Sequence, residues 1–178
     1  MQTEIELRIL DIDVQKFQSK LTSLGAVFLW ESFMKRFVYD FTPIQANSWI
    51  RLRDTWKKTT LTIKEIQNDS ITWTKELETI VEDFDTTHAI LKRLGYTERS
   101  YQENRRLSYS LWDVAIEIDF RPHLLPYIEI EWKSIQDVEK TVTLIWFDMK
   151  DTTTQNVETL YANKWIDLRS ISYLKFDE

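Results

Sequence analysis

Cysteine is absent from this chain of 178 residues, and glycine occurs only 2 times. Without cysteine there is no disulfide framework, no thiolate metal site and no thiol nucleophile, so we expect any bound metal to be held by oxygen. The scarcity of glycine also excludes a glycine-rich phosphate loop of the P-loop or Rossmann kind. Nucleotide chemistry, if present, must therefore use a different kind of site.

Long apolar runs are missing as well. No stretch approaches the roughly 20 apolar residues that span a bilayer, and Glu4, Glu6 and Arg8 place charge where a signal peptide needs an apolar core. A formal net charge of -6 argues against nucleic acid as a partner, because binding to its backbone needs clustered Lys and Arg. We therefore expect a cytoplasmic protein with neither membrane nor nucleic acid as partner, either monomeric or homodimeric.

What the chain does contain is alternation of charged and apolar residues with period two, which predicts strands. The segments are Glu4–Arg8, Arg51–Arg53, Thr62–Lys64, Glu76–Glu78, Glu117–Asp119 and Glu129–Glu131. For any one of them, a solvated sheet face with cross-strand ion pairs is a sufficient explanation. Together they are almost purely Glu, Asp and Arg on one face, which favours a closed barrel with its charged face turned inward.

The remaining elements fit one domain over residues 1–178, since no Pro/Gly/Ser-rich linker divides the chain. We expect strands at 3–10, 27–33, 35–41, 48–54, 59–66, 72–81, 96–109, 114–120 and 127–132. Helices are expected at 14–24, 86–94, 138–145 and 153–162, with a short extended piece at 171–176. The predicted fold class is α+β, a single-domain antiparallel β-barrel of about eight strands that forms a charged tunnel, with helices packed outside.

A charged lumen needs a ligand. Carboxylates that face one another in a partly desolvated space are costly unless cations lie between them, and arginines there need anions. Hard divalent cations such as Mg²⁺ and Mn²⁺ prefer carboxylate and phosphate oxygens, while the arginine fork suits phosphate. A divalent metal together with a polyphosphate would satisfy both signs of charge.

The chain resembles the CYTH domains, also called triphosphate tunnel metalloenzymes, which include class IV adenylate cyclases, thiamine triphosphatases and inorganic triphosphatases. The amino-terminal Glu-x-Glu-x-Lys signature stands here as Glu4-Ile-Glu6-Leu-Arg8, with arginine in place of the usual lysine. Further segments similar to successive family strands are Lys35–Asp40, Trp49–Arg53, Leu61–Lys64, Lys75–Glu78, Gln102–Arg106, Glu117–Asp119 and Pro126–Glu131. The resemblance covers nearly the whole chain.

This resemblance implies roles for individual residues. The triphosphate-binding residues would be Arg8, Arg36, Arg51, Arg53, Lys64 and Arg106. The metal ligands would be Glu4, Glu6, Glu117, Asp119, Glu129 and Glu131. The catalytic residues would be Glu4, Glu6, Arg8 and Glu78, and Glu76 would complete the acidic wall.

The implied function is metal-dependent hydrolysis of inorganic tripolyphosphate or of a nucleoside or thiamine triphosphate, with Mg²⁺ or Mn²⁺ as cofactor. One alternative is a class IV adenylate cyclase that converts ATP to cyclic AMP and pyrophosphate. Another is a polyphosphate-binding module without turnover. That reading is motivated by Arg8 and by Asn104, which stands where the family often has a lysine two residues before the arginine that matches Arg106.

Tryptophan is abundant, with 8 residues in the chain, whereas the 2 glycines are far fewer than an average usage of about 7% would give. Six of the tryptophans stand where a turn or a helix end favours glycine. They are Trp56, Trp73, Trp112, Trp132, Trp146 and Trp165. At the positions of Trp132, Trp146 and Trp165, members of the family that the chain resembles often have glycine. One hypothesis is that these positions are glycine in the native protein and that a reassigned stop codon is rendered as tryptophan. The alternative is aromatic packing on the outside of the barrel.

Overall fold

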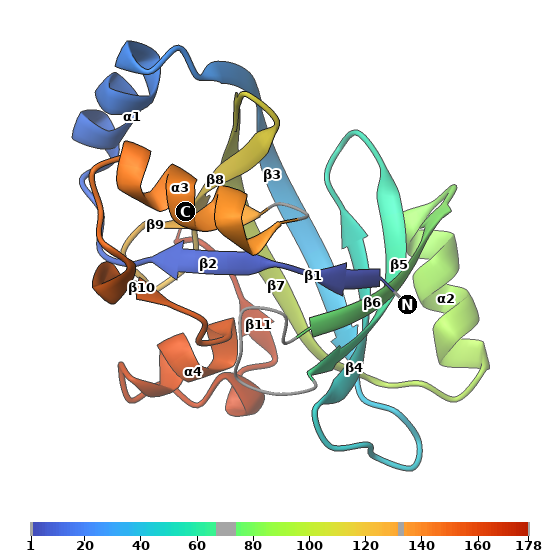
Figure 1. Ribbon diagram of the computed structural model, residues 1–178. Helices are drawn as coiled ribbons and strands as arrows, with labels where there is room; N and C mark the ends of the chain where they lie inside the picture. The colour runs from blue at the N-terminus through green and yellow to red at the C-terminus, as the bar shows by residue number, and fades with distance from the viewer. Residues whose placement is uncertain (1, 67–73, 132–133, 178) are drawn as a thin grey trace.

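The structure, a computed structural model, describes residues 2–66, 74–131 and 134–177. Its centre is a single sheet of eleven strands, in the hydrogen-bonded order β1-β6-β5-β4-β3-β7-β8-β9-β2-β10, with β11 paired to β7 (Figure 1). The strands are β1 (Gln2–Glu4), β2 (Glu6–Ile9), β3 (Val27–Tyr39), β4 (Ser48–Asp54), β5 (Thr59–Ile66), β6 (Thr74–Val81), β7 (Glu98–Leu111), β8 (Val114–Phe120), β9 (Tyr127–Glu131), β10 (Thr152–Thr153) and β11 (Tyr173–Leu174). The β11–β7 pair is parallel, whereas the other pairs are antiparallel.

The amino-terminal segment contributes strands to two distant places in the strand order of this sheet. β1 pairs with β6 and β2 pairs with β9, and only Ile5 separates the two strands in the chain. No direct strand pair between the two ends of the order, β1 and β10, closes the ladder within the described residues. The segment around Ile5 nevertheless brings the two sides of the sheet together, so the sheet curves around an interior, as the expected barrel requires.

The helices are α1 (Val14–Ser23), α2 (Phe84–Arg93), α3 (Ile135–Leu144) and α4 (Val157–Ala162), with short 3-10 turns η1 (Met149–Asp151) and η2 (Leu168–Ser170). α1, α2 and α3 pack on the outer face of the sheet, whereas Val157 and Glu158 at the start of α4 line the cavity. The amino-terminal caps of α1 to α4 are the side chains of Asp13, Asp83, Ser134 and Asn156, each of which accepts a backbone hydrogen bond. In the described part of the chain, no helix is long and apolar enough to cross a membrane.

Two apolar clusters hold α1, α2 and α3 against the sheet. Phe17 of α1 and Val142 of α3 are buried in one cluster with residues of β2, β7, β8 and β9, such as Ile116. Phe84 of α2 is buried in the second cluster with Leu52 of β4. The apolar strand residues in these two clusters thus face outward, under the helices, and the alternation turns their charged neighbours inward.

Most element predictions are confirmed, and several bounds are wrong. The strands at 48–54, 59–66 and 114–120 match the structure, as does the placement of helices outside the sheet. The predicted strands 27–33 and 35–41 form one strand, β3, because no turn residue interrupts the chain at Met34. The strand predicted at 3–10 divides at Ile5, and the one predicted at 96–109 runs over Glu98–Leu111.

The helices also begin later or earlier than predicted. Residues 153–156 are not helical, because Asn156 caps α4 and the chain before it forms β10. α2 begins at Phe84 rather than at residue 86, since Asp83 is its cap, and α3 begins at Ile135 rather than at residue 138. The predicted strand positions 72–73 and 132 lie outside the described residues.

Candidate functional site

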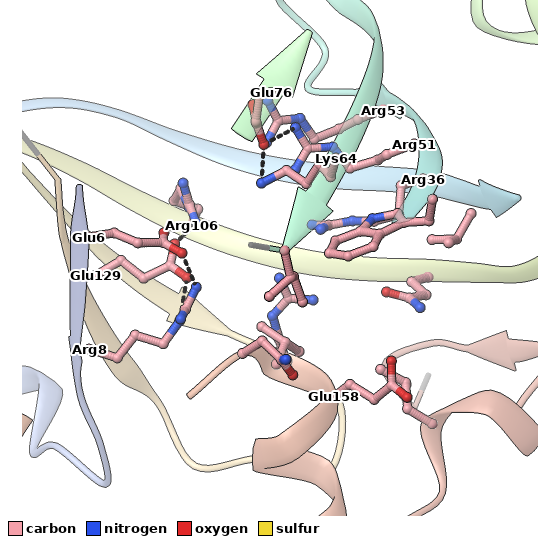
Figure 2. A pocket seen from close by; sticks show the side chains of 18 of the residues that line it. Glu6, Arg8, Arg36, Arg51, Arg53, Lys64, Glu76, Arg106, Glu129 and Glu158 are labelled. Carbon is pink, nitrogen blue, oxygen red and sulfur yellow. Dashed lines mark hydrogen bonds and ion pairs between the residues drawn. The ribbon is translucent and has the colours of Figure 1, made fainter. Parts of the chain in front are cut away.

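The charged faces of the strands line a cavity of about 450 Å³. The charged lining residues are Glu6, Arg8, Arg36, Arg51, Arg53, Lys64, Glu76, Glu78, Arg99, Arg106, Arg121, Glu129, Glu131 and Glu158. Figure 2 shows Glu6, Arg8, Arg106 and Glu129 close together in one group and Arg36, Arg51, Arg53, Lys64 and Glu76 in another, with Glu158 apart from both. Both signs of charge therefore face one space, as the alternation predicts.

Arg8 lies at the centre of the first group. Its Nε donates to Glu129 Oε1 at 2.9 Å, its Nη2 donates to Glu6 Oε1 at 2.7 Å, and its Nη1 donates to the backbone oxygen of Gln155 at 2.8 Å. The strand register explains the contact, because Arg8 on β2 stands directly opposite Glu129 on β9. The Arg8 side chain is buried, and it is neutralised by Glu6 on its own strand and by Glu129 on the neighbouring strand β9.

Arg106 of β7 completes this group from the other side of Glu129. Its Nε donates to Asp119 Oδ1 at 3.0 Å, and its Nη2 donates to Asp119 and to Glu129 Oε2. Asp119, which is 0% exposed, also accepts from Asn104 Nδ2 at 3.1 Å. We call Glu6, Arg8, Arg106, Asp119 and Glu129 the paired cluster, since each charge in it contacts an opposite one.

The paired cluster sets the ionisation of its carboxylates. Burial opposes the charged form of Glu129, but Arg8, Arg106 and Arg121 outweigh it and hold the pKa of Glu129 well below its usual range. Glu117, which faces Glu129 across the β8–β9 pair, behaves in the opposite way. Burial raises the pKa of Glu117 to about 7, against the opposing effect of Arg106. Two carboxylates on adjacent strands thus differ in charge state near neutral pH.

The second group is different because two of its arginines, Arg36 and Arg121, have no carboxylate contact within the described residues. Arg36 of β3 is 7% exposed, donates from Nη2 to the amide oxygen of Asn104, and has no ion pair within the described residues. Its Nε is buried without any hydrogen-bond partner there. Arg121, also buried, donates from Nε to the Tyr127 hydroxyl at 2.7 Å and likewise has no carboxylate contact in the described chain.

Electrostatics confirm that positive charge is in excess here. Burial, followed by repulsion from Arg121, Arg51 and Arg53, lowers the pKa of Arg36 well below the usual value for arginine. We call Arg36, Arg51, Arg53 and Arg121 the arginine group. A buried cation among other cations is unfavourable unless an anion joins it, so the group has the charge pattern of an anion-binding site.

Two glutamates of β6, Glu76 and Glu78, border the arginine group. Glu78 of β6 accepts a hydrogen bond from Thr62 at 2.8 Å and lies 3.4 Å from Arg51 Nη2 and 3.6 Å from Arg53 Nη2. Burial opposes its ionisation, but the Thr62 hydrogen bond and Arg53 with Arg51 lower the pKa of Glu78 overall. Glu76 pairs with Lys64 of β5 and lies 3.6 Å from Arg51 Nη2. Here the cations outnumber the two carboxylates.

Most of the residues predicted for the site line the cavity. Of the triphosphate-binding set, all six do: Arg8, Arg36, Arg51, Arg53, Lys64 and Arg106. Of the predicted metal ligands, Glu6, Glu129 and Glu131 line it, whereas Asp119 lies beneath Arg106 and Glu117 is not among the lining residues. Backbone pairing places Glu4 opposite Thr74, and its side chain lies outside the described residues.

The sequence analysis did not single out several lining residues. Arg121 follows β8 in the loop before Pro122, where no period-two pattern operates, so only its basic character next to a predicted strand end could have indicated it. Gln102 on β7 has the same parity as Arg106, so parity could have identified it. Arg99 has the opposite parity and lies where the β3–β7 register shifts, between Glu98 and Ser100, so alternation could not have placed it at the cavity. Glu158 comes from α4, and no sequence signal relates that helix to the cavity.

The carboxylates suit a hard divalent cation in their donor type, since each contributes oxygen. Glu117 adds a specific observation: its Oε2 is buried without a hydrogen-bond partner in the described structure. Within the described residues, however, no three acidic or histidine side chains already converge as a metal site, because Arg8 and Arg106 occupy the oxygens of Glu6, Glu129 and Asp119. The donors fit such an ion, although they now bind arginine.

Comparisons with known proteins give a consistent result. The sequence family described as "CYTH domain" matches residues 2–155. A Methanocaldococcus jannaschii protein named "Putative adenylate cyclase" is 25% identical over 176 residues, which cover 94% of this chain and 99% of that protein.

Solved structures share the fold. A protein from Pyrococcus horikoshii has a TM-score of 0.76 at 21% identity and covers 88% of this chain and 98% of its own. A Hippeastrum protein, described as a putative adenylyl cyclase with a dominant triphosphatase activity, has a TM-score of 0.62 at 14% identity over 93% and 97% of the two chains. These likenesses confirm the antiparallel fold with outer helices.

Proposed function

Because this chain belongs to the CYTH domain family, we propose that it hydrolyses a triphosphate in its cavity with the help of a divalent metal ion, acting in the cytoplasm. The observation that supports this most is Arg36, a buried arginine without a carboxylate partner in the described residues, placed among three other arginines. An anion of high charge would relieve that repulsion. A linear triphosphate has the charge and the many oxygens that such a group can bind.

The arginine group would bind and orient the phosphates. Guanidinium groups present planar sets of N–H donors and stay charged at neutral pH, so Arg36 and Arg121 would donate to phosphate oxygens from the buried end of the cavity. From β4 and β5, Arg51, Arg53 and Lys64 would bind further oxygens of the triphosphate. Phosphoryl transfer depends chiefly on positioning and charge neutralisation, which fixed cations supply.

The acidic residues would have a separate role. Glu4, Glu6, Glu117, Asp119, Glu129 and Glu131 are the proposed ligands of Mg²⁺ or Mn²⁺. When bound, such an ion would withdraw negative charge from the phosphate oxygens. Arg8 and Arg106 keep Glu129 ionised, which is the state that a metal ligand requires.

Hydrolysis also needs a water molecule directed at the terminal phosphorus. As its oxygen bonds to phosphorus, the bond to the bridging oxygen breaks and the water loses a proton. Glu6 and Glu78 are carboxylates on the cavity wall that can accept that proton, and Arg8 holds Glu6 in place through the 2.7 Å hydrogen bond. Under this proposal, one cavity would combine cation binding, anion binding and a proton acceptor.

The test is product analysis with purified protein. Tripolyphosphate, ATP and thiamine triphosphate are each incubated with Mg²⁺ or Mn²⁺, and phosphate, pyrophosphate and cyclic AMP are resolved. We expect phosphate release that requires metal and that falls about 100-fold in Arg36→Met, since one charged donor to the transition state is lost. Tight binding without any product would instead favour the non-catalytic binding module.

A matched control comes from the same strand. Lys35 precedes Arg36 on β3, points to the other face, and pairs with Asp54 at 3.8 Å. Lys35→Met removes one positive charge at almost the same place but outside the cavity. Equal loss of activity in Lys35→Met and Arg36→Met would show that general charge, not the cavity cation, is responsible.

Cyclisation of ATP is the second candidate. Trp49, Val38 and Ile66 form an apolar part of the cavity wall, which a nucleoside could contact while its phosphates reach the arginines. The Methanocaldococcus jannaschii relative is also named as a cyclase. If a nucleotide is the substrate, Trp49→Ala should raise the KM for ATP and leave the KM for tripolyphosphate unchanged. Formation of cyclic AMP rather than phosphate from ATP would favour this second function.

A further inference from the structure

Seven residues other than glycine have a left-handed backbone with positive φ in the described chain, and four of them are tryptophan. The seven are Asp11, Asn47, Trp56, Trp112, His123, Trp146 and Trp165. Asp, Asn and His tolerate this conformation better than other residues, whereas a bulky side chain there is an outlier, because its Cβ crowds the following carbonyl oxygen. The φ angles of the four tryptophans are 63°, 54°, 71° and 61°.

The ends of the helices provide an internal comparison. After α1 and α2 the chain passes through Gly25 and Gly95, with φ of 76° and 93°. Gly25 N–H donates to Thr22 O at 3.0 Å, and the next residue, Ala26, donates to Leu21 O at 2.9 Å. Gly95 makes the corresponding bond to Lys92 O at 3.1 Å, and its successor donates to Leu91 O at 3.0 Å. This is the pattern of a helix end that uses a left-handed glycine.

The ends of α3 and α4 repeat the same hydrogen bonds with tryptophan. Trp146 N–H donates to Thr143 O at 3.1 Å, and the next residue donates to Val142 O at 3.1 Å. Trp165 N–H donates to Ala162 O at 2.9 Å, and the next residue donates to Tyr161 O at 3.1 Å. Four helix ends thus share one backbone geometry, and tryptophan takes the place of glycine in two of them.

The other two tryptophans lie in hairpin turns. Leu111 pairs with Val114, so Trp112 and Asp113 form a two-residue connection between β7 and β8. Only the first of the two has positive φ, and a hairpin turn of that kind favours glycine at its first central position. Trp56 lies in the β4–β5 connection, where Thr55 N–H donates to Lys58 O at 3.1 Å.

Side-chain packing does not explain these four tryptophans. Their exposed fractions are 79% for Trp56, 65% for Trp112, 80% for Trp146 and 99% for Trp165. Lys20 lies over the Trp146 ring and Lys140 lies 5.6 Å from the Trp112 ring, whereas Trp56 and Trp165 have no ring contact within the described residues. Exposed cation–π contacts contribute less than a left-handed backbone costs a bulky residue.

The two remaining described tryptophans behave ordinarily. Trp30 lies in β3, where it is 39% exposed and has Lys57 Nζ 4.1 Å from its ring centre, and Trp49 lies in β4 on the cavity wall. Neither has positive φ. The described tryptophans therefore form two classes: two lie in strands with negative φ, and four have the positive φ that glycine adopts easily.

We propose that positions 56, 112, 146 and 165 are glycine in the protein as its source organism makes it. A stop codon that the organism reads as glycine, but that the sequence renders as tryptophan, accounts for the pattern. It would explain both the 8 tryptophans and the 2 glycines. Trp73 and Trp132, which the same hypothesis covers, lie outside the described residues. The proposal rests on backbone conformation and side-chain exposure, and it does not depend on the proposed function.

Substitution tests the backbone argument directly. The chain with Trp56→Gly, Trp112→Gly, Trp146→Gly and Trp165→Gly is compared with the parent and with the corresponding fourfold alanine variant. Alanine removes the indole but keeps the Cβ that crowds a left-handed backbone. We expect glycine to raise the melting temperature above the alanine variant by about 2–4 °C for each position, since each left-handed Cβ costs on the order of 1 kcal/mol.

A control separates this effect from the general loss of indoles. Trp30→Gly removes a tryptophan from a strand with ordinary backbone, so it should lower the melting temperature. A fourfold glycine variant that melts at or below the fourfold alanine variant would overturn the backbone argument.

Mass spectrometry tests the identity of the residues. Peptides that cover positions 56, 112, 146 and 165, taken from protein purified from its natural source, should each carry the mass of glycine. Tryptophan at these positions in the natural protein would overturn the proposal, whatever the variants show.

Discussion

The two sides of the cavity contain the same residue type in opposite situations. In the paired cluster, the buried Arg8 and the half-buried Arg106 have Glu6, Glu129 and Asp119 at hydrogen-bond distance. In the arginine group, Arg36 is equally buried but has only the amide of Asn104 as a partner in the described structure. The pKa of Arg106 is raised by its carboxylate neighbours, whereas that of Arg36 is lowered by burial and by other arginines.

This difference separates buried charges that the protein itself compensates from buried charges that it leaves uncompensated within the described residues. Buried ions are tolerated when opposite charges and hydrogen bonds compensate their desolvation. The paired cluster meets that condition within the protein. In the arginine group, Arg36 and Arg121 have no carboxylate contact in the described chain, and the proposed triphosphate would supply that compensation. We therefore expect Arg36 and the paired cluster to respond in opposite ways to mutation.

The largest effect is expected for Glu129→Gln. Glu129 lies between Arg8 and Arg106, and removing its charge leaves both arginines with one carboxylate fewer. We expect the free energy of unfolding to fall by about 3–5 kcal/mol, measured by urea denaturation. Glu131→Gln is the control, since Glu131 is an exposed carboxylate of the same strand and its loss should cost no more than about 1 kcal/mol. Equal losses in the two variants would contradict the pairing.

The next effect contrasts two arginines. Arg36→Met should stabilise the protein by about 1–2 kcal/mol, because an uncompensated buried charge is removed. Arg8→Met should destabilise it by about 3 kcal/mol, because Glu6 and Glu129 lose their shared partner. Thermal melting of both variants without ligand gives the comparison. A destabilisation of similar size in both would show that the two sides of the cavity do not differ as described.

The smallest effect concerns pH. The pKa of Glu78 is lowered in the folded protein, so its contribution to stability is present above the pKa of an unfolded glutamate and is lost as the pH falls through the folded value. Glu78→Gln should therefore cost about 1 kcal/mol at pH 7, and the difference from the parent should shrink in acid. Urea denaturation across pH 3–7 measures it, and a difference that grows toward acid would contradict the assigned cause.

Much of the fold could be predicted because strand alternation is a local signal. The bounds of β4, β5 and β8 follow from alternation and from turn residues at their ends. β3 could not be recognised as one strand, since its first residues are exposed and apolar while its later ones alternate. The amino-terminal break at Ile5 depends on pairing with two distant strands, which no local pattern reveals.

The site was predictable to the extent that parity determines which side chains face inward. Parity placed Glu6, Arg8, Arg51 and Glu129 at the cavity. It could not distinguish a carboxylate that lines the cavity from one such as Asp119, which lies behind an arginine. Nor could it separate compensated arginines from Arg36, because that depends on which residues the neighbouring strands bring opposite each other.

The most direct test of the account is the binding of tripolyphosphate in the presence of a chelator, measured by titration calorimetry. The parent chain and Lys35→Met should bind with affinities within about twofold of each other, because Lys35 lies outside the cavity. Arg36→Met should bind at least about tenfold more weakly, which corresponds to about 1.4 kcal/mol. Undiminished affinity in Arg36→Met would contradict the claim that the side of the cavity around Arg36 is the triphosphate site.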